Sequence, residues 1–286
     1  MRESEVTRLT ALALAALLVL PVVHGVAALA VAAGFVAEFL AGVPGPLSAL
    51  VPVPARTPLP VAGAAVDRYA PAGGGVPLVL VHGYAPEGKD DARVQAAAAL
   101  LARAGFDVAV PTIPGLTVGR LRPPDAGPVA ATLAARAEPA VVLAVSVGAG
   151  PALLAAADPA VAGRVRRVVS VGGYASAREL LRFYLTGEYA WEGRRGRVRH
   201  DRALVAAFVA ANAEVVDEPT RRAMAAGDVA AVERFLQAPP PDVAALLEAL
   251  SPLRVAPGLK APLVLVHGRD DPAVPYTESL RLAAAR

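Results

Sequence analysis

The chain has 286 residues, a length that allows one large domain or two small ones. Its formal net charge is +3, carried almost entirely by arginines that are dispersed and accompany no nucleic-acid-binding motif, so no nucleic-acid partner is expected. Cysteine is absent, which excludes disulfides, a thiolate nucleophile and a cysteine-based metal site.

The N-terminal segment is apolar. From Leu9 to Leu40 the clear polar interruptions are Thr10, His24 and Glu38. About 20 consecutive apolar residues suffice to cross a bilayer. Residues 1–41 are therefore predicted to form a transmembrane anchor that holds the protein at a membrane by a single pass.

The orientation of this anchor follows from the flanking charges. Arg2 and Arg8 precede the span and the first cation after it is Arg56, so the domain that follows is expected on the extracytoplasmic side. A cleaved export signal is the alternative, with Ala28-Leu29-Ala30 as the cleavage site and a secreted product.

The residues after the anchor divide into a linker and one domain. Repeated prolines in residues 42–60 predict an extended, semi-rigid tether. Within residues 61–286, predicted strands alternate with predicted helices, which indicates a mostly parallel sheet with helices on both faces. The predicted strands are residues 60–69 (one or two strands), 76–81, 106–110, 140–145, 165–171 and 261–267, and the predicted helices between them include residues 89–104 and 128–137.

One strand-to-helix turn predicts a nucleophile. The segment Ala144 to Gly150 follows an apolar run and precedes a helix-like stretch. A serine at such a turn has a strained backbone and an exposed hydroxyl, and small residues two places on either side let strand and helix approach closely. Ala144 and Gly148 occupy those places, so Ser146 is the predicted nucleophile. The amide of Val147 then points into the site because it begins the helix.

Two further turns end buried strands. The early strand that starts at Val76 ends in His82-Gly83, and the late strand that starts at Ala261 delivers Asp270 and Asp271, followed by Val274-Pro275. The carboxyl ends of parallel strands meet at one edge of a sheet, where ligands bind. The three turns are therefore expected to lie close together.

The order and spacing of these turns resemble the α/β-hydrolase family, over about residues 60 to 286. The resemblance is greatest to membrane-anchored bacterial members in which His-Gly-Tyr runs into Pro-Glu-Gly-Lys-Asp-Asp, as residues 82–91 do. It implies a serine hydrolase of the carboxylic-ester type that cleaves an ester or related acyl bond of a small molecule or lipid. No cofactor or metal is expected, because no dinucleotide fingerprint, Walker loop or metal-ligand cluster is visible.

The resemblance assigns a role to each site residue. Ser146 is the nucleophile, and the backbone amides of Tyr84 and Val147 form the oxyanion hole. Asp271 fits the acid position of the family's G-x-x-D turn, whereas Asp270 is expected to cap a helix. His82 and His267 are expected to be structural.

The chain departs from the family at the catalytic histidine. In the family the triad runs in the order Ser, Asp, His, and no histidine follows Asp271. We therefore expect a C-terminally truncated chain that lacks the last strand, the histidine loop and the final helix, and that is inactive as it stands. A non-catalytic α/β-hydrolase-like binding or scaffold domain is the alternative.

The rhythm of strands and helices breaks between residues 177 and 257. This stretch contains helix-like pieces and no strand signal, and by the resemblance it is a helical cap over the substrate pocket. It also carries the cluster Arg194, Arg195, Arg197, Arg199 and His200. A solvated or membrane-surface face is favoured for this cluster over a clamp for an anionic substrate.

Overall fold

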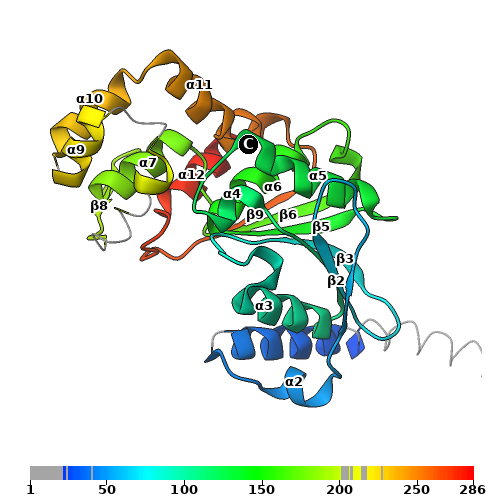
Figure 1. Cartoon of the computed structure of the whole chain (residues 1–286). Coiled ribbons are helices and arrows are strands. Elements are labelled where there is room, and N and C mark those ends of the chain that lie inside the picture. The colour runs from blue at the N-terminus through cyan, green and yellow to red at the C-terminus, as the bar shows by residue number, and fades with distance from the viewer. Residues whose placement is uncertain are drawn as a thin grey trace, which may run out of the picture.

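The computed structural model describes residues 22–23, 25–39, 41–200, 206, 209–213, 218–226 and 228–286. In this part of the chain a seven-stranded sheet forms the centre of the molecule (Figure 1). The strands β3, β4, β5, β6 and β9 are parallel to their neighbours among one another. The strand β2 is antiparallel to both β1 and β4. The predicted mostly parallel sheet is therefore confirmed. In sheet order the strands are β1 (Ala55–Pro58), β2 (Val66–Ala70), β4 (Phe106–Pro111), β3 (Val76–Val81), β5 (Ala140–Val145), β6 (Val165–Val171) and β9 (Leu263–Val266).

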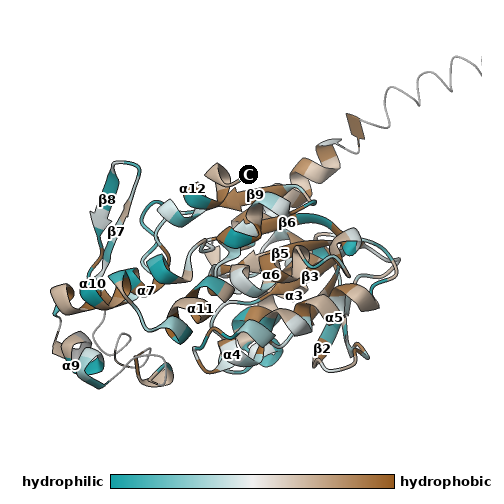
Figure 2. Cartoon of the chain, turned by 90° about the horizontal axis from the view of Figure 1, so that it is seen from above, coloured by the Kyte–Doolittle hydropathy of each residue, from teal (hydrophilic) through white to brown (hydrophobic). Residues whose placement is uncertain are grey.

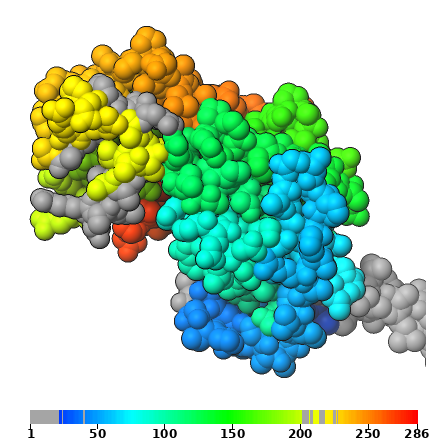
Figure 3. Space-filling view, viewed as in Figure 1, coloured from blue at the N-terminus to red at the C-terminus, as the bar shows by residue number. Residues whose placement is uncertain are grey.

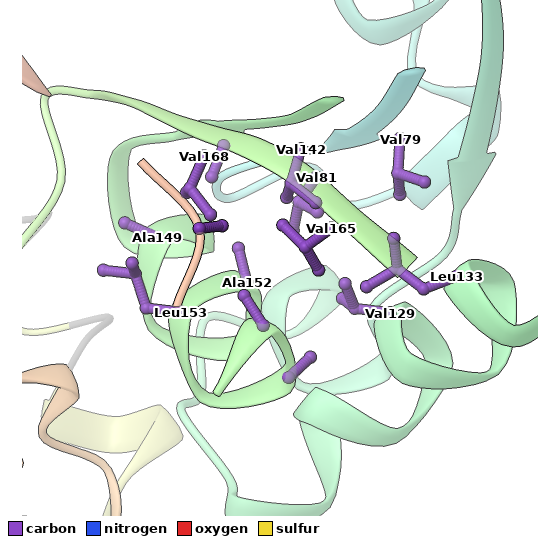
Figure 4. Packing of buried hydrophobic residues seen from close by; sticks show 14 of the residues in the cluster. Val79, Val81, Val129, Leu133, Val142, Ala149, Ala152, Leu153, Val165 and Val168 are labelled. Carbon is purple, nitrogen blue, oxygen red and sulfur yellow. The ribbon is translucent and has the colours of Figure 1, made fainter. Parts of the chain in front are cut away.

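Helices cover both faces of the sheet, because side chains alternate along each strand. Leu78 and Leu80 of β3 pack in a core with the helix α3. Val79 and Val81 point to the opposite face, where they join a core with α5 and α6 (Figure 4). The sheet is therefore doubly wound. The helices of this domain are α3 (Ala92–Arg103), α4 (Pro114–Thr117), α5 (Ala126–Ala135), α6 (Ala149–Ala156) and α12 (Thr277–Ala284).

The insertion between β6 and β9, from about residue 177 to 257, is called the cap. It lies at one end of the sheet and appears yellow to orange in Figure 3. It has its own core, which includes Leu180, Phe235 and Leu236. The prediction that this stretch has no strands is wrong, because β7 and β8 pair as an antiparallel hairpin. Glu192 and Gly193 at its turn have φ of 44° and 77°, as a two-residue hairpin loop requires. The described cap elements are α7 (Ala177–Thr186), β7 (Glu188–Trp191), β8 (Arg194–Arg197), α9 (Glu218–Ala226), α10 (Val229–Gln237) and α11 (Pro241–Ala249).

The proline-rich residues 42–60 are not an extended tether. They contain α2 (Pro46–Leu50) and the edge strand β1, so the folded domain begins before residue 61. Pro46 occupies the first turn of its helix, where the missing N–H has no cost. Pro58 lies in an edge strand, the one place in a sheet that tolerates proline. The prolines thus fit regular elements that their number alone did not suggest.

The end of the apolar N-terminal segment packs on the domain. Residues 25–39 are helical, and Phe35 lies against the core that β3 shares with α3. The buried carboxylate of Glu38 accepts hydrogen bonds from the backbone amides of Leu47 and Ser48 at the start of α2. A side chain that interrupts the apolar pattern therefore caps the neighbouring helix.

No helix in the part of the chain that the structure describes combines the length and the apolar character needed to cross a bilayer. Part of the predicted span from Leu9 to Leu40, namely residues 9–21, His24 and Leu40, lies outside the described residues. The transmembrane anchor stays a prediction.

A buried ion cluster joins three elements of the domain. Asp107 of β4 accepts two hydrogen bonds from Arg68 of β2, at 2.8 and 2.9 Å, and lies 2.7 Å from the guanidinium of Arg136, which follows α5. Burial alone would raise the pKa of Asp107, but the hydrogen bonds and charges of Arg68 and Arg136 outweigh it and lower the pKa. Asp107 is therefore ionised in the folded protein at neutral pH.

Replacing Asp107 by Ala is expected to destabilise the fold by about 3 kcal/mol, because it leaves the buried guanidinium of Arg136 without its carboxylate partner. The full difference in the free energy of unfolding should be present at neutral pH. It should shrink as the pH falls through the lowered pKa of Asp107, because the wild-type carboxylate then also becomes neutral. Urea unfolding at several pH values measures it. The exposed Glu138→Ala variant is the control, and an equal loss in both variants would contradict a special role for the cluster.

Candidate active site

Ser146 lies at a strained turn between β5 and α6. Its φ is +53°, in the left-handed region that non-glycine residues rarely adopt. Such strain persists only where the surrounding structure enforces it, and it is common at active sites. A Cβ placed on Gly148 would lie 2.3 Å from the carbonyl oxygen of His82, so only glycine fits there. The local geometry is that of a nucleophile elbow.

The turn after β3 lies against this elbow. The strands β3 and β5 are parallel neighbours with Val81 opposite Ala144, so both chains leave the sheet at the same edge. A Cβ on Gly83 would be 3.1 Å from the Cβ of Ser146 and 3.7 Å from its hydroxyl oxygen. The amide of Tyr84 follows directly. The His-Gly turn and the serine are thus brought together, as the sequence predicts.

The two predicted oxyanion-hole amides have no competing partner. In the described part of the chain, neither the N–H of Tyr84 nor that of Val147 donates a hydrogen bond to a protein acceptor. The side chain of Tyr84 is 55% exposed, so this turn reaches the surface. Unpaired amides beside a nucleophile are the arrangement that holds a developing oxyanion.

His82 shapes the turn rather than taking part in chemistry. One ring nitrogen, Nδ1, donates to the carbonyl of Gly83 at 2.7 Å, and Nε2 accepts from the amide of Ile113 at 3.1 Å. Burial lowers the pKa of His82, which keeps the imidazole neutral in this tautomer. The ring therefore ties the end of β3 to the segment after β4.

Asp271 lies beside the turn that follows β6, one strand away from the elbow. A Cβ on Gly172 would be 2.9 Å from Oδ2 of Asp271, and Gly172 has a φ of +61°. The other oxygen, Oδ1, accepts the amides of Ala273 and Val274 at 2.8 and 3.1 Å. These two bonds fix the carboxylate, and Oδ2 accepts no hydrogen bond from the described residues. Asp270, by contrast, is exposed.

His267 is held inside the acid turn. Its Nε2 lies 2.9 Å from the carbonyl oxygen of Val274 and its Nδ1 lies 2.7 Å from the hydroxyl of Ser279. Oδ2 of Asp271 is 3.6 Å from Nε2, beyond hydrogen-bond distance. Both ring nitrogens thus have protein partners that connect the end of β9 to α12.

His200 packs within the cap. Its Nε2 lies 2.9 Å from the carbonyl oxygen of Phe183, and its ring contacts Phe183 edge-on at 4.7 Å between centroids. Each of the three histidines in the described residues therefore has a structural partner, and His24 lies outside those residues. Within the described residues no group of histidine and carboxylate side chains can hold a metal ion.

The cap reaches the acid turn through α7. Tyr184 of α7 is largely buried, and burial together with the negative charge of Asp271 raises its pKa to about 12. Val274 of the acid turn is fully buried in the core of the cap, and Val147 of the elbow packs against the same core. The cap, the nucleophile turn and the acid turn therefore share apolar contacts.

Sequence reasoning missed Glu278, a buried carboxylate near the start of α12. It accepts the amides of Ala175 and Ser176 at 3.0 and 2.8 Å, where the chain leaves β6 for the cap. Burial raises the pKa of Glu278, although these amides and the charge of Arg281 oppose the rise. Glu278 thus joins the helix after the acid turn to the first helix of the cap. An acidic residue in a first helical turn is ordinarily assigned to the helix dipole, so its sequence position did not single it out.

No protein-family model and no curated protein matches the sequence. Solved structures do resemble it. An acylaminoacyl peptidase from Pyrococcus horikoshii is 17% identical over 83% of this chain, with a TM-score of 0.50, and the match covers 35% of that peptidase chain.

Two other solved structures are similar over most of their own length. A meta-cleavage product hydrolase from Pseudomonas fluorescens IP01 is 18% identical, covers 82% of this chain and 86% of that chain, and has a TM-score of 0.45. A bacterial membrane phospholipase A is 14% identical, covers 96% of this chain and 87% of that chain, and has a TM-score of 0.46. Together with the sheet order and the elbow, the likeness to the peptidase shows that the chain has the α/β-hydrolase fold, as its motifs predict.

Proposed function

We propose that the chain is the catalytic domain of a membrane-anchored serine hydrolase that cleaves an ester or related acyl bond. The observation that carries this proposal is the backbone of Ser146, a non-glycine residue at a φ of +53° on the turn between β5 and α6. A plain turn would place glycine or asparagine there, because other residues pay for this conformation. The strained backbone turns the hydroxyl of Ser146 out of the turn, where a substrate can reach it.

The arrangement suits acyl transfer. The hydroxyl oxygen of Ser146 attacks the substrate carbonyl, and a histidine takes its proton. The oxygen of the tetrahedral intermediate is held by the amides of Tyr84 and Val147, whose N–H groups have no other protein acceptor in the described residues. The alcohol then leaves with the proton, and water releases the acyl group from Ser146 by the same route.

The base of this reaction is a histidine other than the three in the described residues. His82 and His267 use both ring nitrogens for structural contacts, and His200 packs within the cap. Asp271 has one oxygen fixed by two amides, and the other accepts no hydrogen bond from the described residues, which suits a carboxylate that orients an imidazole. The substrate class, an ester or lipid, is proposed from the resemblance of the three turns to those of α/β-hydrolases.

One experiment tests both the chemistry and the location. Cells that express the full-length gene product are separated into membrane and soluble fractions, treated with a fluorophosphonate, and the labelled peptide is identified by mass spectrometry. We expect a labelled protein in the membrane fraction with the adduct on Ser146, because only an activated serine reacts with this reagent at neutral pH.

Other outcomes would overturn parts of the proposal. An unlabelled protein without esterase activity would favour the non-catalytic binding or scaffold domain. A labelled soluble protein whose mature N-terminus is Val31 would replace the anchor with a cleaved export signal. An adduct on a different serine would refute the assignment of the nucleophile while leaving the location intact.

A further inference from the structure

The hairpin of β7 and β8 presents arginine side chains on one face. Tyr189 pairs with Gly196 in the register of the two strands, and the ring of Tyr189 contacts Phe183 and Tyr276, so this face packs on the protein. Side chains alternate along a strand, so the neighbouring positions point outward. Arg195 and Arg197 hold those positions, Arg199 follows two residues beyond the end of β8, and all three are exposed.

Little negative charge compensates this face. Arg197 pairs with Glu188 across the hairpin at 3.9 Å, the outer limit of an ion pair. Within the described residues no carboxylate forms an ion pair with Arg195 or Arg199. Figure 2 shows the hairpin in the colours of hydrophilic residues, projecting from the rest of the molecule. The outward face is therefore a compact cationic surface.

The hairpin is fixed to the domain, not only to the cap. The rings of Tyr189 and Tyr276 meet edge-on at 5.8 Å between centroids, and Tyr276 directly precedes α12. Arg281 of α12 donates to the carbonyl oxygen of Ala190 at 2.7 Å. These contacts fix β7 to the domain, so the arginines of the hairpin have a defined position relative to the acid turn. A surface that binds these arginines would therefore orient the whole domain.

Apolar side chains are exposed on the N-terminal segment, at the other end of the molecule from the hairpin in Figure 2. In Figure 2 the hairpin and the start of the described N-terminal helix both point toward the top of the view. Val22, Val26 and Leu29 of that segment are exposed by 65%, 62% and 72%. An apolar segment at one end and a cationic surface at the other can contact one lipid bilayer together, because both attract a protein to an anionic membrane.

We propose that the outward face of the β7–β8 hairpin docks the domain on an anionic phospholipid surface. Arginines near such a surface are attracted to lipid phosphates. Trp191 lies on the opposite face of the hairpin, with Tyr189, and is half-buried. The two strands would lie on the headgroups while the N-terminal segment holds the protein there. The proposal rests on the membrane location proposed above and not on the chemistry of Ser146, so the two can fail separately.

The chain supplies its own probe, because Trp191 is the single tryptophan and lies in this hairpin. The full-length protein is reconstituted into vesicles of phosphatidylcholine alone or of phosphatidylcholine with phosphatidylglycerol, with shallow brominated lipids in both. We expect bromine to quench Trp191 in the anionic vesicles only, and molar salt to reverse the quenching because it screens the attraction. Each arginine at an anionic surface contributes about a fivefold factor, so removing three should weaken docking on the order of a hundredfold.

Three variants make the test specific. Glutamines at the outward positions should abolish quenching, and lysines at the same positions should restore it because the charge is kept. The control removes three exposed arginines elsewhere, one of them also in an ion pair, and should quench like the wild type. Equal quenching in both kinds of vesicle, or quenching that survives the glutamine variant, would overturn the proposal. The glutamine variant is Arg195→Gln, Arg197→Gln and Arg199→Gln, and the control is Arg166→Gln, Arg167→Gln and Arg222→Gln.

Discussion

Replacing Ser146 by Ala is expected to lower the kcat of the full-length protein on an activated ester by a factor on the order of 10⁶ and to abolish fluorophosphonate labelling. The reason is that the nucleophile, its base and the orienting acid act as one unit, so the loss of one member removes nearly the whole effect. A small residual rate should remain from the amides of Tyr84 and Val147, which the substitution does not touch. Steady-state hydrolysis of a p-nitrophenyl ester measures it.

The matched control is Ser170→Ala. Ser170 is buried near the end of the neighbouring strand β6, and its hydroxyl has no hydrogen-bond partner among the described residues, so its loss should change neither labelling nor rate. Urea unfolding of both variants shows whether either is misfolded. A Ser146→Ala protein that folds and still turns over ester would remove the serine from the mechanism.

Much of the site is predictable because its signals are local. The small residue Gly148, two places after Ser146, indicates a close approach of strand and helix. In the structure a Cβ added to Gly148 would lie 2.3 Å from the carbonyl oxygen of His82. The meeting of the three turns follows from the parallel sheet, since the carboxyl ends of parallel strands share one edge. Neither inference needs knowledge of distant contacts.

Other features depend on contacts that a local pattern does not contain. The strands β7 and β8 carry charged rather than apolar alternation, so they resemble a solvated loop until the packing of Tyr189 on Tyr276 and Phe183 is known. In residues 42–60 the prolines suggested a tether, yet their positions at a helix start and an edge strand are compatible with regular structure. Glu278 looks like a surface residue of a helix start and is in fact buried.

Asp271→Asn is expected to lower kcat by a factor on the order of 10⁴ with little change in KM. The amide oxygen of the new side chain can still accept the N–H groups of Ala273 and Val274, so the turn should keep its shape. Its NH₂ group would then take the place of Oδ2. A donor at this position cannot accept the N–H of an imidazole, which therefore turns to the wrong tautomer for taking the proton of Ser146.

Asp270→Asn is the matched control, because it makes the same chemical change one residue earlier on an exposed side chain. It should keep the wild-type rate, and both variants should unfold at similar urea concentrations. If Asp270→Asn loses activity and Asp271→Asn does not, the assignment within the turn is reversed. If both keep full activity, neither carboxylate orients the base, and Oδ2 of Asp271, fixed on one side by two amides and close to Gly172 on the other, would have a purely structural role.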